Sequence, residues 1–303
     1  MPLLKFQFKP GIDKEGTSYT DEFGWYNSDK IRFRSGHPEK IGGWAKYSSS
    51  TFLGTARSLY NYSSASGTNY IGIGTHLKFY IADGTSYNDI TPIRATTSAG
   101  DVTFSATNGD ATITVADTAH GAVKNDFVTF SGAASLGGNI IANVLNQEYQ
   151  IATIVNANSY TIEAKDTDGD TVTANSSDSN NGGSSTVGAY QINVGLDEYV
   201  SSTGWGASAW GDGTFGSAAS LDDTNQLRLY SQDNFGDDLI FCPRAGGVYY
   251  WDQSSGTSTR AVNFSSLGSA SNVPTKCLQI MVSDVDRHII AFGSNPVGSS
   301  THA

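Results

Sequence analysis

The sequence is poor in charged residues and has no long apolar run. Only 16% of its 303 residues are charged, which argues against long amphipathic helices with charged outer faces. No apolar stretch approaches the roughly 20 residues of a membrane span, and the N-terminus lacks the apolar stretch and cleavage site of a secretory signal. We therefore expect almost no helix, no membrane span and no export by a standard signal.

Cysteine is also scarce. Cys242 and Cys277 are the two cysteines of the chain, and both lie in apolar, strand-like runs. Two thiols do not make a disulfide framework, so the sequence favours packing of both as small hydrophobic side chains over a bridge between them. The redox compartment of the protein is left open by this pattern.

Motifs for catalysis and for metal binding are missing. The five histidines have no second ligand at the spacing of a zinc site, and no nucleophile elbow, P-loop or dinucleotide-binding glycine motif is present. The acidic run Asp166–Asp170 resembles the start of a calcium loop but lacks the distal glutamate, so we interpret it as a hairpin turn, with a cation site as the alternative. The sequence predicts no enzyme, no cofactor and no metal site.

The sequence does contain a repeated strand pattern. The stretch Thr68–Gly84 is matched by Asp237–Gly256, and a third copy begins at Asp286–Gly293. In the first two copies a short apolar strand is followed by a turn, an aromatic strand and a turn containing aspartate. A period of about 40 to 50 residues with several strands per unit is typical of a propeller blade. We therefore predict an all-β fold built from β-propeller-type blades.

The chain divides into four predicted segments. These are an N-terminal arm (1–46), a first blade region (47–94), an inserted β-domain (95–188) and further blades of an incomplete propeller (189–303). The third segment is rich in Thr, Val, Asp and Asn and has its own strand rhythm, which predicts a small barrel or sandwich, because surface loops accept long insertions. Closing a propeller takes about four blades, so we expect either a longer polypeptide or an edge supplied by another chain.

Several finer features follow from these patterns. Gly72 and Gly74 lie within a predicted strand, where small residues let another backbone approach closely. Pro92 suggests an edge or exit strand. The strands predicted around the repeated hairpins and in the inserted domain are 57–62, 89–94, 111–117, 126–133, 148–164 and 170–175.

The arm carries the candidate interface residues. Leu4–Phe8 alternates apolar and polar residues, and Lys30–Arg34 places basic side chains on one face of a strand and apolar side chains on the other. Such an arm cannot form a core alone, so we expect it to dock on the body or on a neighbouring subunit. The candidate subunit-interface residues are Leu4, Phe6, Phe8, Lys30, Arg32, Arg34 and Trp44.

The charge is unevenly distributed. Residues 1–60 carry a net charge of +3, residues 61–200 carry −10 and residues 201–303 carry −4. An acidic body argues against binding of nucleic acid by phosphate neutralisation, which needs clustered Lys and Arg. It is compatible with the passage of DNA, because an acidic wall repels the phosphate backbone.

The arm and the first blade region carry a family resemblance. The runs FKPGIDKEGT, WYNSDKIRFRSGHPEKIGGW and FLGTARSLYNYSSASGTNYIGIGTHLKFYI resemble the tail nozzle proteins of short-tailed bacteriophages, including tail tubular and packaged-DNA stabilisation proteins. The resemblance continues in GWGASAWG and DVDRHIIAFGSNPVGSS and covers about two thirds of the chain. The segment from His120 to Ala164 resembles a β-module that recurs in phage structural proteins.

The resemblance implies a structural role in a virion. It implies a homo-oligomeric β-propeller ring, six-fold in symmetry, at the distal end of the tail channel, where it retains the packaged genome and then conducts it out. The implied partners are tail adaptor proteins, with fibre or needle proteins as further candidates, and DNA that passes without sequence-specific binding. The implied location is the phage tail, after assembly in the host cytoplasm. Family members extend well past the position of Ala303, so closure of the propeller stays open.

Two other function classes are left open. A virion-associated receptor-binding or polysaccharide-binding protein would use the aromatic residues as a sugar platform, although such residues more often form a blade core or a subunit contact. A propeller glycosidase would need two carboxylates about 5 to 10 Å apart in a pocket. The aromatic residues concerned are Trp205, Trp210, Tyr249, Tyr250 and Trp251.

Overall fold

A computed structural model shows an all-β chain in two compact units, Met1–Ser49 and Ser50–Ala303. In the described residues, helix is limited to α1 (Ala142–Leu145) and two 3-10 turns, η1 (Gln253–Ser255) and η2 (Phe264–Ser266). A four-residue α-helix is too short to cross a membrane, and no other described helix is longer. The structure describes residues 8–17, 19–20, 22–84, 86–196, 227–268, 270, 272–283 and 285–294.

The first unit, here called the arm unit, contains one short hairpin. Strand β1 (Ile31–Arg34) pairs antiparallel with β2 (His37–Lys40), and the turn between them has positive φ at Ser35 and Gly36. The sequence predicted a strand from Lys30, but β1 begins one residue later. Lys30 has a φ of 57°, a left-handed conformation that a strand residue does not adopt.

The second unit begins with a four-stranded antiparallel sheet, here called the first sheet. Its strands follow one another in space as in sequence: β3 (Ala56–Ser63), β4 (Asn69–Thr75), β5 (Phe79–Ala82) and β6 (Tyr87–Asp89). The predicted closing strand at 89–94 is wrong, because the closing strand ends at Asp89. The residues that follow Pro92 form β7 (Ile93–Thr96), which belongs to a different sheet.

A second sheet repeats this arrangement. Its order is β16 (Tyr230–Phe235), β17 (Asp238–Pro243), β18 (Tyr249–Trp251) and β19 (Val262–Asn263). The matching sequence copies thus occupy matching hairpins, β4–β5 and β17–β18. The third copy contributes β21 (Ile289–Phe292), which pairs with β20 (Gln279–Val282) in a third hairpin.

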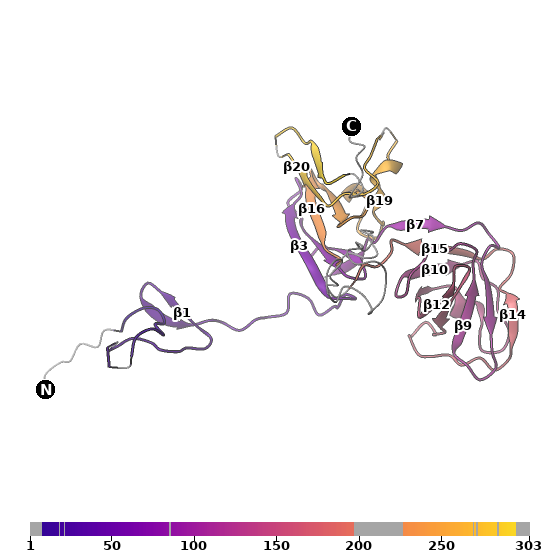
Figure 1. Cartoon of the computed structure of the whole chain (residues 1–303), viewed down its shortest axis with the longest axis horizontal. Helices are drawn as coiled ribbons and strands as arrows, with labels where there is room; N and C mark the ends of the chain where they lie inside the picture. The colour runs from indigo at the N-terminus through magenta and orange to yellow at the C-terminus, as the bar shows by residue number, and fades with distance from the viewer. Residues whose placement is uncertain are drawn as a thin grey trace, which may run out of the picture. The chain divides into compact units, whose positions relative to one another are not determined.

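The three pieces pack in series through apolar layers, with β16 lying beside both β3 and β20 (Figure 1). Between the first and second sheets, the rings of Phe79 and Phe241 stack with centroids 3.8 Å apart. Between the second sheet and the third hairpin, Ile240, Cys242 and Ile280 lie in one buried cluster. Burial of these side chains supplies the main driving force for joining the sheets.

The two strand glycines allow this close packing. A Cβ at Gly74 would lie 2.3 Å from Cδ2 of Tyr230, and a Cβ at Gly72 would lie 2.2 Å from Oε1 of Gln232. Tyr230 and Gln232 both belong to β16 of the second sheet. The close approach expected at these glycines is therefore made by side chains of the second sheet.

The inserted segment forms two sheets around one core. One sheet has the order β11-β10-β15-β7 and the other β12-β13-β9-β8-β14. Their facing side chains, such as Phe104 and Phe130, meet in a common cluster. The strands are β8 (Thr103–Ala106), β9 (Thr112–Ala116), β10 (Phe127–Ser131), β11 (Glu148–Gln150), β12 (Thr153–Asn156), β13 (Ser159–Glu163), β14 (Asp178–Asn181) and β15 (Val187–Gln191).

The entry and exit strands of this segment lie side by side. β7 pairs with β15, with Thr96 opposite Ala189 and Ile93 opposite Gln191. A segment whose two ends are adjacent can be accommodated in a loop of the surrounding fold at low entropic cost. One strand prediction inside it is wrong: 170–175 forms no strand, and β14 lies instead in the polar run that follows, at Asp178–Asn181.

Candidate functional site

The basic face predicted in the arm unit is present on β1. Arg32 and Arg34 are exposed, whereas Ile31 and Phe33, which alternate with them, are half-buried. Arg32 Nε donates to Oε2 of Glu39 on the paired strand at 3.2 Å. Lys30 lies just before the strand and is close to Asp29, with 3.9 Å between its Nζ and the carboxylate. Exposed pairs of this kind contribute little to stability, so the two arginines are available for other contacts.

The apolar candidates of the arm unit are largely exposed. The ring of Phe8 packs on Phe23 and Trp25, yet Phe8 remains 51% exposed, and Trp44 is fully exposed. Trp25 also contacts Phe33, which connects the aromatic cluster to the apolar side of β1. Leu4 and Phe6 lie outside the described residues.

The arm unit therefore has an aromatic cluster without a closed core. Among its described residues no apolar side chain is buried. Soluble proteins rarely expose so many large apolar side chains close together, and such a surface marks an interaction site. Those of the arm unit are Phe8, Ile12, Tyr19, Phe23, Tyr26, Ile41, Trp44 and Tyr47.

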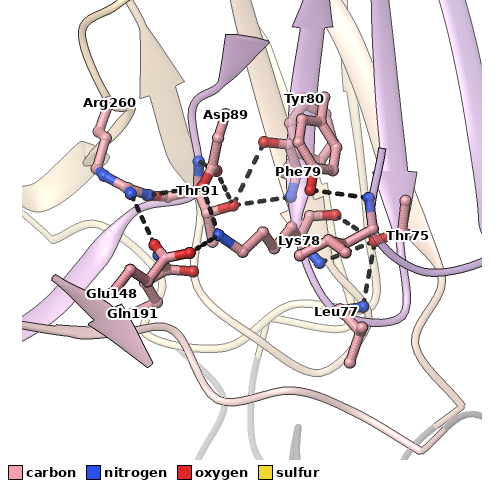
Figure 2. A network of polar contacts seen from close by, with 11 residues as sticks. Thr75, Leu77, Lys78, Phe79, Tyr80, Asp89, Thr91, Glu148, Gln191 and Arg260 are labelled. Carbon is pink, nitrogen blue, oxygen red and sulfur yellow. Dashed lines mark hydrogen bonds and ion pairs between the residues drawn. The ribbon is translucent and has the colours of Figure 1, made fainter. Parts of the chain in front are cut away.

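A second polar constellation, which the sequence did not reveal, lies in the second unit. Lys78 donates to Asp89 Oδ2 at 2.7 Å and to Glu148 Oε1, and Arg260 contacts the same two carboxylates at 3.4 and 3.2 Å (Figure 2). The four side chains form a closed ring of alternating charge, here called the charge ring. Lys78 is only 3% exposed, whereas the other three side chains are 23 to 30% exposed.

The local sequence around each charge sets its direction. The turn between β4 and β5 is fixed by Thr75, whose hydroxyl accepts from the backbone N–H of Lys78 at 2.8 Å. Asp89 at the end of β6 accepts from the hydroxyl and N–H of Thr91, and Glu148 on β11 accepts from the Gln191 amide at 2.5 Å. Thr91 and Gln191 thus help to orient the two carboxylates that face the cations, as the close view shows (Figure 2).

The charge ring favours the ionised form of Asp89. Burial acts to raise the pKa of Asp89, but the charges of Lys78 and Arg260 outweigh it and hold that pKa below its usual value of 3.8. The ammonium group of Lys78 also lies 4.5 Å from the centre of the Phe127 ring, a cation–π distance. A buried lysine is stabilised here by two carboxylates and one aromatic face.

The charge ring joins three parts of the second unit. Lys78 and Asp89 belong to the first sheet, Glu148 to the inserted segment, and Arg260 to the loop before β19 of the second sheet. Asp89 and Glu148 come together as a pair of carboxylates, but both are bound by the same two cations. A general acid or nucleophile needs a carboxyl group that can reach a substrate and exchange a proton. The arrangement is that of a structural joint.

The other sequence candidates have structural roles where they are described. Tyr249 and Trp251 are buried between the two sheets, so they offer no platform for a sugar. Asp166 accepts from the backbone N–H groups of Asp168 and Asp170, which closes the acidic run as a turn. Trp205 and Trp210 lie outside the described residues.

One histidine belongs to a buried polar network. His120 is buried in the inserted segment, where its Nδ1 accepts from the N–H of Ala122 at 3.0 Å and its ring lies edge-on to Tyr160. Tyr160 in turn shares a hydrogen bond with Tyr190, which donates to Asp117. Sequence spacing gave no signal for this network, because its members come from separate strands and loops.

Comparisons with known proteins give little similarity. No protein-family model matches the chain, and no curated protein matches it. Among solved structures it is similar to the phage phi92 endosialidase, with a TM-score of 0.25 and 12% sequence identity. The match covers 68% of this chain and 30% of the endosialidase chain. Similarity at this level assigns neither fold nor activity.

Proposed function

We propose that the chain is a structural virion protein, a tail nozzle subunit whose ring forms the channel that retains and then conducts a phage genome. The observation that carries this proposal is the arm unit. Its described residues have exposed arginines and many exposed apolar side chains but no buried apolar core. The same stretch carries the sequence resemblance to nozzle proteins, so two independent features support an assembly role.

The body of the protein is, in this proposal, part of a β-propeller. Two four-stranded antiparallel sheets with the same strand order pack face to face, and a third hairpin packs on the second. Successive sheets of this kind are the building units of a propeller. The inserted segment is then a small β-sandwich carried in a loop of the first blade.

Ring formation is assigned to the arm. An extended segment can add strands or aromatic side chains to a neighbouring copy, which turns exposed apolar surface into a subunit contact. The basic face of β1 is complementary to the acidic body, since residues 61–303 carry a net charge of −14. The proposed contact is therefore between the arm unit of one copy and the body of the next.

Deletion of residues 1–46 tests this assignment. We expect the shortened protein to be a soluble monomer, whereas the full chain forms rings, as measured by light scattering after size-exclusion chromatography and by electron microscopy. The double variant Arg32→Glu and Arg34→Glu is expected to weaken assembly at moderate salt, and Lys124→Glu, an exposed change in the inserted segment, is the matched control. Rings of normal stoichiometry from the deleted protein would refute the assignment.

The route of the DNA gives a second test. We propose that acidic side chains line the channel, so that the genome slides without binding. Electron microscopy of the assembled ring would locate the wall. A predominantly basic wall would contradict the proposed passage of DNA without contradicting the role of the arm.

A further inference from the structure

The two cysteines face each other across the layer between the second sheet and the third hairpin. Their Sγ atoms are 2.8 Å apart, and both residues are fully buried. Cys242 is on β17, and Cys277 lies just before β20, 35 positions further along the chain. A disulfide has its sulfurs about 2.05 Å apart, so a small movement of the side chains suffices to form one.

The backbone on both sides is fixed by hydrogen bonds. Cys277 accepts from the N–H of Ala245 and donates its own N–H to Gly246, each at 2.9 Å. Cys242 is held in β17, opposite Ser231 of β16. The short separation of the sulfurs therefore results from the packing of two backbone segments rather than from two freely rotating side chains.

Both thiols lie in a buried site. The Cys242 thiol donates to the carbonyl oxygen of Pro243 at 3.1 Å and to that of Cys277 at 3.5 Å, and the other buried residues of the cluster are aliphatic. The hydrogen bond that the two thiols share raises the pKa of Cys242 and lowers that of Cys277. Cys277 is then the thiol that ionises more readily and attacks first.

We propose that Cys242 and Cys277 form an intramolecular disulfide when the protein meets a disulfide oxidant such as oxidised glutathione. The Cys277 thiolate attacks one glutathione sulfur and releases one glutathione thiolate. Cys242, as thiolate, then attacks the Cys277 sulfur of the mixed disulfide and releases the second. Two electrons pass from the cysteine sulfurs to the oxidant, and the two protons end on the two glutathione thiols. The oxidant reaches Cys277 when the third hairpin opens locally.

The crosslink would fasten the third hairpin to the second sheet. This hairpin has two strands, and β21 has no strand partner on its outer side among the described residues. Its packing on the second sheet depends on a small apolar cluster. A covalent link across that cluster restricts the unfolded chain and resists opening of the hairpin.

The test uses the full-length wild-type chain. Protein purified under reducing conditions is treated with oxidised glutathione, denatured, blocked with N-ethylmaleimide, digested and analysed by mass spectrometry. We expect one linked peptide pair containing both cysteines, loss of both alkylation sites together, and no crosslinked dimer. The oxidised protein should also melt about 5 to 10 °C higher than the reduced protein.

The variant Cys277→Ala is the control, since its melting temperature should not depend on the oxidant. Hydrogen exchange of the Cys277 and Ile280 amides establishes that the third hairpin opens during the treatment. The proposal would be overturned if the hairpin opens and both cysteines are still alkylated by N-ethylmaleimide after the treatment. A stable mixed disulfide at one cysteine, or a disulfide between two copies, would also overturn it. Mass spectrometry of the oxidised wild-type protein tests the proposal even if the Cys277→Ala variant folds poorly.

Discussion

At the scale of single residues, the charge ring places two cations and two carboxylates in direct contact. Lys78 is the buried member and is bound by both carboxylates. Removing one partner of a buried ion pair leaves its opposite charge desolvated and unpaired, which costs about 3 to 5 kcal/mol. If Lys78 is removed from the charge ring, Arg260 still balances part of the negative charge, because it contacts both carboxylates.

The substitution Lys78→Met removes the ammonium and keeps most of the aliphatic side chain. We expect a loss of about 2 to 4 kcal/mol in the free energy of unfolding, measured by urea denaturation, because Arg260 compensates for part of the lost charge. The matched change Lys124→Met removes an exposed lysine and should alter stability by less than about 0.5 kcal/mol. Equal, small effects of the two substitutions would contradict a stabilising charge ring.

The pH dependence of stability follows from the lowered pKa of Asp89. Its carboxylate binds a proton less readily in the folded chain than in the unfolded chain, so its contribution is complete above the usual pKa of 3.8 and is lost as the pH falls through the lower folded value. The stability difference between wild type and Asp89→Asn should therefore shrink between about pH 5 and about pH 2. Asp126, whose pKa is raised by burial, has the opposite effect and is present in both proteins.

Thermal unfolding monitored by circular dichroism at several pH values measures this difference. A gap between wild type and Asp89→Asn that stays constant down to about pH 2 would show that the Asp89 charge does not contribute.

At the scale of elements, the contact between the first and second sheets depends on the absence of side chains on β4. Gly74 faces Tyr230, and Gly72 faces Gln232 and Leu239. The sequence correctly indicated strands and hairpins, but the close approach at these glycines is made by side chains rather than by another backbone. The sequence did not indicate which element would approach, since β4 and β16 are separated by the whole inserted segment.

The substitution Gly74→Ala places a Cβ within 2.8 Å of two atoms of the Tyr230 ring. We expect a loss of about 1 to 3 kcal/mol, because a rigid ring in a packed layer has little room to move. Gly268→Ala is the control, since a Cβ there meets no atom within 4 Å. Unfolding in guanidinium chloride measures both. Unchanged stability of the Gly74→Ala protein would show that the two sheets are not packed closely at this point.

The positions at which strands begin and end do not follow from the local sequence pattern. The stretch 89–94 reads as one strand, but Asp89 closes the first sheet and Ile93 opens the inserted segment. Likewise 170–175 has the alternation of a strand without pairing as one, whereas the polar run at Asp178–Asn181 pairs with β8. Pairing depends on which backbone edge is available, and a local pattern does not contain that information.

At the scale of the whole molecule, the proposed passage of DNA depends on the distribution of charge. The chain has a net charge of −11, and its excess of basic residues is confined to the first 60 positions. We expect binding of duplex DNA weaker than about 10⁻⁴ M at physiological salt, measured by fluorescence anisotropy of a labelled duplex.

The double variant Asp168→Lys and Asp170→Lys is a control for the sensitivity of this assay and should bind more tightly. Tight, steeply salt-dependent binding by the wild-type chain would contradict the proposed passage of DNA.

The sequence by itself determined the all-β class, the repeated hairpins and the alternation of basic and apolar residues on β1, because each depends on residues that are close together along the chain. The tertiary structure decided the partners: Lys78 with Glu148, Phe79 with Phe241, and Cys242 with Cys277. These pairs are 35 to 162 positions apart in sequence. Their contacts form only when the sheets pack, since burial brings together side chains whose spacing along the chain carries no common pattern.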